Sequence, residues 1–172
     1  MSFLVLIALP TAFLMLATHW SQRKILLPDA MRFGMALGFL LTGVDHFISA
    51  EIRYVPMLPT ILQDWGLELV YVTGAAEILG AIGLLLPLRW YRILGLPELR
   101  RASGIGLAIM LACVVVANIN VALTGQSVQG MDFGAWYFWI RPAFQPVFIV
   151  WALYCSGAWS LGRSSGQVPS NS

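Results

Sequence analysis

Charged side chains are scarce in this chain. Asp, Glu, Lys and Arg make up 10% of its 172 residues, whereas soluble domains carry roughly 25%. Hydrophobic residues make up 59%, and several apolar stretches approach the roughly 20 residues that cross a bilayer as a helix. The sequence therefore excludes an ordinary soluble domain and predicts an all-α, polytopic membrane helix bundle. The net charge of only +2 gives no electrostatic support for nucleic-acid binding.

Cysteine is also rare, and its placement excludes several chemistries. Cys113 and Cys155 fall in different predicted helices, and the chain contains no Cys-x-x-Cys pair. This pattern argues against a dithiol relay and against a zinc site, so we expect both residues to be small hydrophobes. We find no haem, flavin or iron–sulfur motif, and hence no cofactor visible in the sequence. Electron transfer would therefore need a partner protein or the ligand itself.

Five apolar helices are predicted, over residues 2–18, 31–48, 68–87, 102–123 and 140–157. Alternate connections between them are basic. The basic residues of these connections and of the tail are Arg23, Lys24, Arg32, Arg89, Arg92, Arg100, Arg101 and Arg163. Cytoplasmic loops of membrane proteins are enriched in Lys and Arg. The pattern predicts five spans in the cytoplasmic membrane, with the N-terminus on the outer side and the C-terminus on the cytoplasmic side.

The chain divides into three predicted parts. Residues 1–19 form an N-terminal transmembrane helix, which has no preceding Lys or Arg and no clear cleavage site, so we expect a retained span rather than a signal peptide. Residues 28–160 form a four-helix membrane domain. Its long connection, 49–67, contains two prolines and several apolar residues, which predicts an interfacial segment above the bundle. The polar tail, 161–172, is predicted to be disordered and cytoplasmic.

Glu77 lies alone in the middle of the apolar run 67–87. A carboxyl group at this depth in a membrane helix is costly and marks a candidate functional site. It follows Glu68 by nine residues, which places it roughly 13 Å below the outer end of its helix. We therefore expect Glu77 to handle protons.

Other polar residues are predicted to share the outer half of the membrane with Glu77. The inner half of the bundle is almost wholly apolar. The polar layer draws on four helices, and we expect it to form a ligand-binding site. Its expected members besides Glu77 are Asp45, His46, Asn118, Arg141 and Gln145. No metal site is predicted.

Glu77 can be accommodated in such a layer in two ways. It can stay protonated and donate to Asn118 or Gln145, or it can pair with Arg141 or a protonated His46. Either arrangement suits proton transfer to a quinone or another lipophilic ligand. The alternative is a buried polar network that only fixes the register of the helices.

The remaining members of the layer also have plainer interpretations. Asp45 can simply face water, and Arg141 can be an interfacial anchor that extends toward the membrane surface. Trp136, Tyr137 and Trp139 are predicted to precede the last helix as part of an interfacial aromatic belt.

Small residues indicate where helices approach closely. Gly34 and Gly38 form a small-x-x-x-small pattern on the second helix. On the third helix, Gly74 and Ala81 lie on the same stripe as Glu77, one turn away on either side. A neighbouring helix or a ligand can therefore reach the carboxyl group.

Five segments together resemble the DoxX family of small membrane proteins. They are 43–47 (GVDHF), 54–59 (YVPMLP), 73–81 (TGAAEILGA), 117–122 (ANINVA) and 139–145 (WIRPAFQ). The resemblance covers about residues 32–154 and implies a four-helix membrane fold, to which the first helix would be an addition. By position, the resemblance matches five of this chain's polar residues to those of the family: His46, Glu77, Asn118, Arg141 and Gln145.

The resemblance implies fold and location more directly than activity. One relative is a subunit of a thiosulfate:quinone oxidoreductase, others are associated with redox complexes, and eukaryotic relatives act in assembly or trafficking. The first hypothesis is a redox-associated protein of the bacterial inner membrane that binds a quinone or similar lipophile. If it is an enzyme, it is a subunit of a quinone-linked oxidoreductase with a membrane or peripheral partner. The alternative is a non-enzymatic subunit that assembles a membrane complex through helix 2–18 and the Gly34/Gly38 face.

Overall fold

The computed structural model describes residues 3–20, 25–125, 128 and 135–159, and these residues form an all-helical bundle. The predicted disordered tail, 161–172, lies outside the described residues. The same holds for Arg23, Lys24 and Arg163, on which part of the charge argument depends.

Five long helices make up most of the described chain: α1 (Phe3–Trp20), α2 (Leu27–Ile48), α4 (Gly66–Leu85), α6 (Arg100–Thr124) and α7 (Ala135–Cys155). Four shorter elements connect them: the π-helix η1 (Ala50–Tyr54), the 3₁₀-helix η2 (Val55–Met57), α3 (Thr60–Gln63) and α5 (Leu88–Ile93). Each predicted membrane helix corresponds to one long helix. α5 was not predicted, because it falls in a basic connection; it begins directly after Pro87, a residue suited to the start of a helix.

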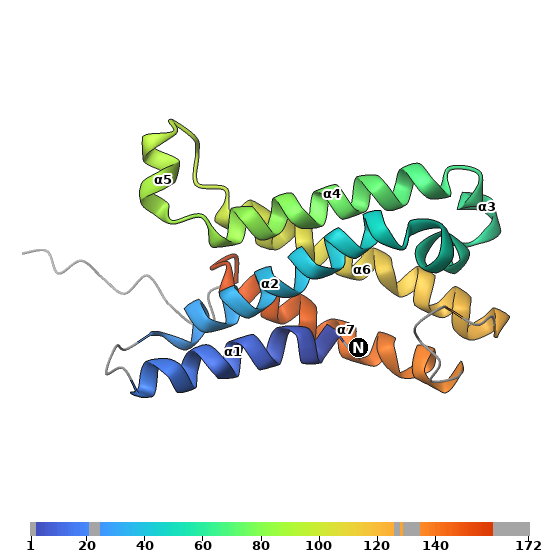
Figure 1. The fold of residues 1–172 in the computed structure, drawn as a ribbon, viewed down its shortest axis with the longest axis horizontal. Coiled ribbons are helices and arrows are strands. Elements are labelled where there is room, and N and C mark those ends of the chain that lie inside the picture. Colours follow the sequence, from blue (N-terminus) through green and yellow to red (C-terminus); the bar gives the residue numbers. More distant parts are fainter. Residues whose placement is uncertain (1–2, 21–24, 126–127, 129–134, 160–172) are drawn as a thin grey trace, which may run out of the picture.

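The long helices run side by side along the longest axis of the molecule (Figure 1). α2 packs against both α1 and α4, and α6 packs against α4 and α7. α5 lies at one end of the bundle, together with the start of α6. η1, η2 and α3 lie at the opposite end, beside the end of α2 and the start of α4 (Figure 1).

Several helices are long and apolar enough to cross a membrane. In the described part of the chain these are α1, α4 and α6, and α2 with η1 and η2 adds a fourth if this pair, bent by 95°, counts as one span. α7 is not among them, because Arg141, Gln145 and two prolines interrupt its apolar sequence.

The predicted start of the last helix at residue 140 was wrong. α7 begins at Ala135 and carries Pro142 and Pro146 inside it. Proline is disfavoured in a helix interior, yet α7 continues through both residues. Trp136, Tyr137 and Trp139 therefore belong to the first turns of the helix and do not precede it. α2 likewise begins earlier than predicted, at Leu27, with Pro28 in its first turn.

α1 packs directly on the glycine face of α2. A Cβ atom added to Gly34 would lie 2.1 Å from Thr11 Oγ1 and 2.3 Å from the Ile7 carbonyl oxygen, so only glycine permits this approach. Gly38 faces Ile7 in the same way. The prediction of a close-approach face is confirmed, but its partner is α1 of the same chain. In the described residues, α1 therefore covers the face that the alternative hypothesis assigns to a partner protein.

The N-terminal end of α1 lies against the middle of the bundle. The Phe3 ring makes edge-on contacts with Phe39 of α2 and Phe148 of α7, with 5.2 Å between ring centroids in each case. Figure 1 shows this end of α1 beside α7, partway along the bundle. Toward the η1 end, α1 therefore leaves α2 and α7 uncovered.

Candidate functional site

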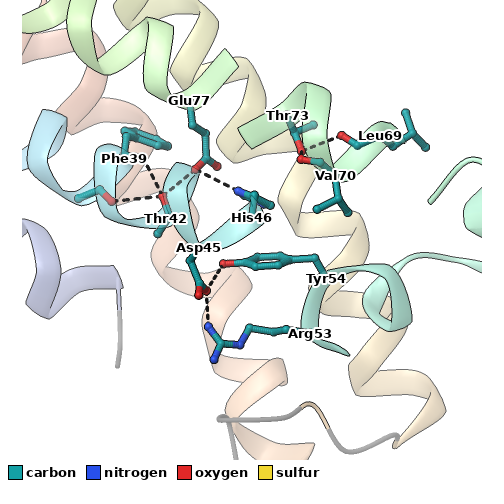
Figure 2. Close-up of polar contacts among 11 residues, drawn as sticks. Phe39, Thr42, Asp45, His46, Arg53, Tyr54, Leu69, Val70, Thr73 and Glu77 are labelled. Atoms are coloured by element: carbon teal, nitrogen blue, oxygen red, sulfur yellow. Dashed lines mark hydrogen bonds and ion pairs between the residues drawn. The ribbon is translucent and has the colours of Figure 1, made fainter. Parts of the chain in front are cut away.

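Glu77 of α4 is buried, with 5% of its surface exposed. Thr42 Oγ1 of α2 donates a hydrogen bond of 2.7 Å to Glu77 Oε2. His46, one turn further along α2, places Nδ1 3.5 Å from the same oxygen (Figure 2). The three side chains form a polar contact between α2 and α4.

Glycines on both helices let α2 and α4 approach closely enough for this contact. A Cβ atom added to Gly74 would lie 2.6 Å from His46 Cβ, and one added to Gly43 would lie 2.9 Å from the Gly74 carbonyl oxygen. Both distances are shorter than real Cβ contacts allow, so the two backbones pack directly against each other. The predicted stripe of small residues beside Glu77 is present, and it brings α2 within reach of the carboxyl group.

Glu77 contacts one residue that the sequence analysis named as a partner and one that it did not. We expected Asn118, Gln145, Arg141 or a protonated His46. In the described residues, His46 Nδ1 lies within ion-pair distance of Glu77 Oε2, and Thr42 supplies the hydrogen bond. The available signal was that Thr42 precedes His46 by four residues, which puts both on one face of α2.

Asp45 is held by the segment that follows α2. Arg53 Nη1 and Tyr54 Oη both donate to Asp45 Oδ2, the latter over 2.7 Å (Figure 2). Ser49 Oγ donates to Asp45 Oδ1 over 2.9 Å. The bend between α2 and η1 folds these donors back over the end of the helix. The interpretation that Asp45 simply faces water was therefore wrong.

Tyr54 also links Asp45 to the Glu77 contact. Its ring lies on the imidazole of His46, with 4.0 Å between ring centroids and 33° between the planes. The hydroxyl group of Tyr54 thus binds Asp45 while its ring covers His46 (Figure 2).

α7 supplies a cation and an amide. The Arg141 guanidinium lies 5.3 Å from the ring centre of Tyr137 and 5.9 Å from that of Phe138, distances typical of a cation–π contact. Gln145, one turn further, is 5% exposed, and its Oε1 atom has no hydrogen-bond partner among the described residues. Trp136 and Trp139 are more than half exposed, whereas Tyr137 turns inward.

The two asparagines of α6 take different roles. Asn118 is fully buried and donates to the Val114 carbonyl oxygen of its own helix over 3.0 Å. Asn120 donates to the Met57 carbonyl oxygen over 3.2 Å and so ties η2 to α6.

A cavity of about 720 Å³ joins these groups. Five of the six predicted site residues line it: Asp45, His46, Glu77, Arg141 and Gln145. Asn118 does not line it. Ligand pockets commonly measure about 300–1,000 Å³, so the cavity has the size of a small-molecule site.

The walls of the cavity are largely apolar. Phe39, Leu111, Phe144 and Phe148 line it, and Phe3 of α1 joins them. Thr42, Arg53 and Tyr54 also line it, and the sequence analysis assigned none of them to the site. Among the described residues, no group of three or more His, Cys, Asp and Glu side chains is placed to hold a metal ion. The arrangement can instead hold an apolar ring and exchange protons and hydrogen bonds with its polar atoms.

Residues 35–156 match the model of a protein family described as a domain of unknown function, DUF8561. The chain belongs to the DUF8561 family. No curated protein and no solved structure matches it. The matched residues include all of the polar cavity residues named above, whereas α1, which contributes Phe3 to the cavity, lies outside the match.

Proposed function

We propose that this DUF8561 protein is a multi-pass membrane protein that binds a quinone or another lipophilic ligand in the cavity between α2, α4, α6 and α7. One observation carries the proposal. A largely apolar cavity of about 720 Å³ contains a buried carboxyl group, Glu77, within reach of Thr42 and His46. Such a combination of apolar walls and few polar groups is typical of small-molecule sites.

The proposed roles follow from the contacts. Glu77 takes up and releases protons, because it is the buried carboxyl group of the cavity. His46 and Arg141 hold oxygen atoms of the ligand, and Asp45 fixes the rim through Arg53 and Tyr54. Electrons would come from the ligand itself or from a redox partner protein. As an enzyme, the protein would therefore act as a subunit of a quinone-linked oxidoreductase.

We further propose five spans in the bacterial inner membrane, with the N-terminus outside and the C-terminus inside. The basic residues Arg89, Arg92, Arg100 and Arg101 lie in α5 or at the start of α6, at one end of the bundle, which supports a cytoplasmic position for that end. α7 serves as the fifth span because it packs along α6. Its polar residues Arg141 and Gln145 line the cavity, which keeps them away from lipid.

The resemblance to the DoxX family supports this proposal. It covers about residues 32–154, and the DUF8561 match covers 35–156. We propose that the two families share a four-helix fold and that α1 is an addition to it. The alternative function, assembly of a membrane complex, loses one argument, because α1 already covers the Gly34/Gly38 face.

Mass spectrometry of co-purifying lipophilic molecules tests the proposal. The wild-type protein is compared with Glu77→Gln and with a matched control, Glu68→Gln, on an exposed position of the same helix. We expect a quinone with the wild type and the control, and its depletion in Glu77→Gln. If all three proteins carry no such ligand and Glu77→Gln is only less stable, the polar layer is structural and the proposal fails.

A further inference from the structure

The hydrogen-bond donors of the cavity are largely engaged within the protein. Thr42 donates to Glu77, and Tyr54 and Arg53 donate to Asp45. A ligand that only accepts hydrogen bonds would have to compete with these contacts. Two of them involve a carboxylate and an arginine or a tyrosine, and bonds to charged groups are the stronger ones in proteins.

One acceptor position of the cavity is open instead. Gln145 Oε1 is buried and has no hydrogen-bond partner among the described residues. Gln145 is 5% exposed and lines the cavity. A buried polar atom left unsatisfied is unfavourable. A ligand that supplies a donor at this position would therefore bind more favourably than one that does not.

Hydroxyl groups meet this requirement and carbonyl groups do not. A carbonyl oxygen only accepts, so it cannot satisfy Gln145 Oε1, whereas a hydroxyl can donate to it. His46 Nδ1 does not discriminate between the two, because it already lies 3.5 Å from Glu77 Oε2. Arg141 does not discriminate between the two, since both kinds of oxygen accept from a guanidinium.

We propose that the cavity selects the reduced, hydroxyl-bearing form of a quinone-class ligand, the quinol, over the oxidised quinone. This inference rests on the proposed function and names the form of the ligand. A site with buried groups that bind a substrate hydroxyl discriminates against analogues that lack it, because those groups then stay unpaired. Gln145 is thus the specificity-determining residue of the cavity.

Equilibrium binding of a matched ligand pair tests the inference. The full-length protein in lipid nanodiscs is titrated under anaerobic conditions with a benzoquinone that carries a decyl chain, and separately with its quinol. We expect the quinol to bind at least about tenfold more tightly, as one satisfied buried acceptor predicts. Gln145→Leu should lower quinol affinity by a similar factor and quinone affinity by less, so that the preference for the quinol shrinks.

A control variant and two contrary outcomes make the test decisive. Val147→Ala changes an exposed position of α7 that does not line the cavity, and it should alter neither affinity. Equal or tighter binding of the quinone by the wild type would overturn the inference while leaving the proposed function intact. If neither form binds, both fail. The wild-type comparison decides even if Gln145→Leu does not fold.

Discussion

Thr42 Oγ1 lies 2.7 Å from Glu77 Oε2 and joins α2 to α4 at the polar wall of the cavity. Thr42 can also donate within its own helix, since its hydroxyl oxygen lies 3.2 Å from the Gly38 carbonyl oxygen. The contact with Glu77 therefore competes with a local one.

Thr42→Val should destabilise the protein by about 1–3 kcal/mol, because Glu77 would lose a hydrogen-bond donor in a buried position. Thr73→Val is the matched control. Thr73 also lines the cavity, but its hydroxyl bonds only the backbone of its own helix, to Leu69 and Val70. We expect the control to cost less than about 1 kcal/mol. Thermal unfolding in detergent measures both. Equal losses in the two variants would show that the contact between α2 and α4 adds nothing.

Gly34→Ala should separate α1 from α2, because the added methyl group would meet Thr11 and the backbone of Ile7. Overpacking of this kind typically costs about 1–3 kcal/mol. Gly106→Ala is the control, because a Cβ atom there meets nothing within 4 Å. Alanine is a better helix former than glycine by about 0.5–1 kcal/mol, so this variant should be neutral or more stable. Thermal unfolding of the two variants in the same detergent provides the comparison. A Gly34→Ala protein as stable as Gly106→Ala would mean that α1 does not pack as described.

Tyr91→Phe should loosen α5. The Tyr91 hydroxyl donates to the Gly83 carbonyl oxygen over 2.7 Å and is the contact that ties α5 to α4. Burial raises the pKa of Tyr91 above its ordinary value of 10.0, and Glu98 adds to this while Arg100 opposes it. We expect a loss of about 1 kcal/mol at neutral pH.

The pH dependence of Tyr91 has a definite sign. Because its pKa is raised in the folded state, its contribution is fully present below pH 10.0 and is lost as the pH rises through the raised value. Unfolding of the wild type at increasing pH should therefore show a loss that Tyr91→Phe lacks. Identical pH profiles would contradict the role of this hydroxyl. Spectrophotometric titration of the tyrosines, with Tyr91→Phe as the blank, reports the pKa directly.

Cysteine labelling tests the proposed orientation. In a background without Cys113 and Cys155, Ile61→Cys in α3 and Leu96→Cys shortly after α5 place single thiols at exposed positions. α3 and α5 lie at opposite ends of the bundle (Figure 1). A membrane-impermeant maleimide should label Ile61→Cys in intact cells and Leu96→Cys only after permeabilisation, because arginines surround position 96. The opposite pattern would invert the topology, and labelling of both from outside would exclude five spans.

The sequence predicted the helices well and the contacts unevenly. Glu77 and the other polar residues could be placed in one layer because each helix fixes the depth of its residues. Thr42 was missed as a partner because threonine hydroxyls in helices commonly bond their own backbone, and the face it shares with His46 was the only signal of a contact across helices.

The rim of the cavity depends on a bend between α2 and η1 that no local sequence pattern predicts. Arg53 and Tyr54 reach Asp45 because η1 turns back over α2. Periodicity identifies regular helices, and a π-helix that follows a sharp bend lies outside what it can detect. The start of α7 at Ala135 was missed as well, and the helix continues through Pro142 although proline is disfavoured in a helix interior.

The rim of the cavity, formed by Asp45, Arg53 and Tyr54, and its inner wall, formed by Phe3 and Phe148, also differ in the sequence separation of the residues that meet there. Asp45, Arg53 and Tyr54 meet across eight and nine residues. The contact between Phe3 and Phe148 joins segments near opposite ends of the described chain. Because short loops close faster and at lower entropic cost than long ones, the rim can form as soon as residues 45–54 are available. The contact between Phe3 and Phe148 needs the last helix, so the cavity can be complete only after α7 has been synthesised.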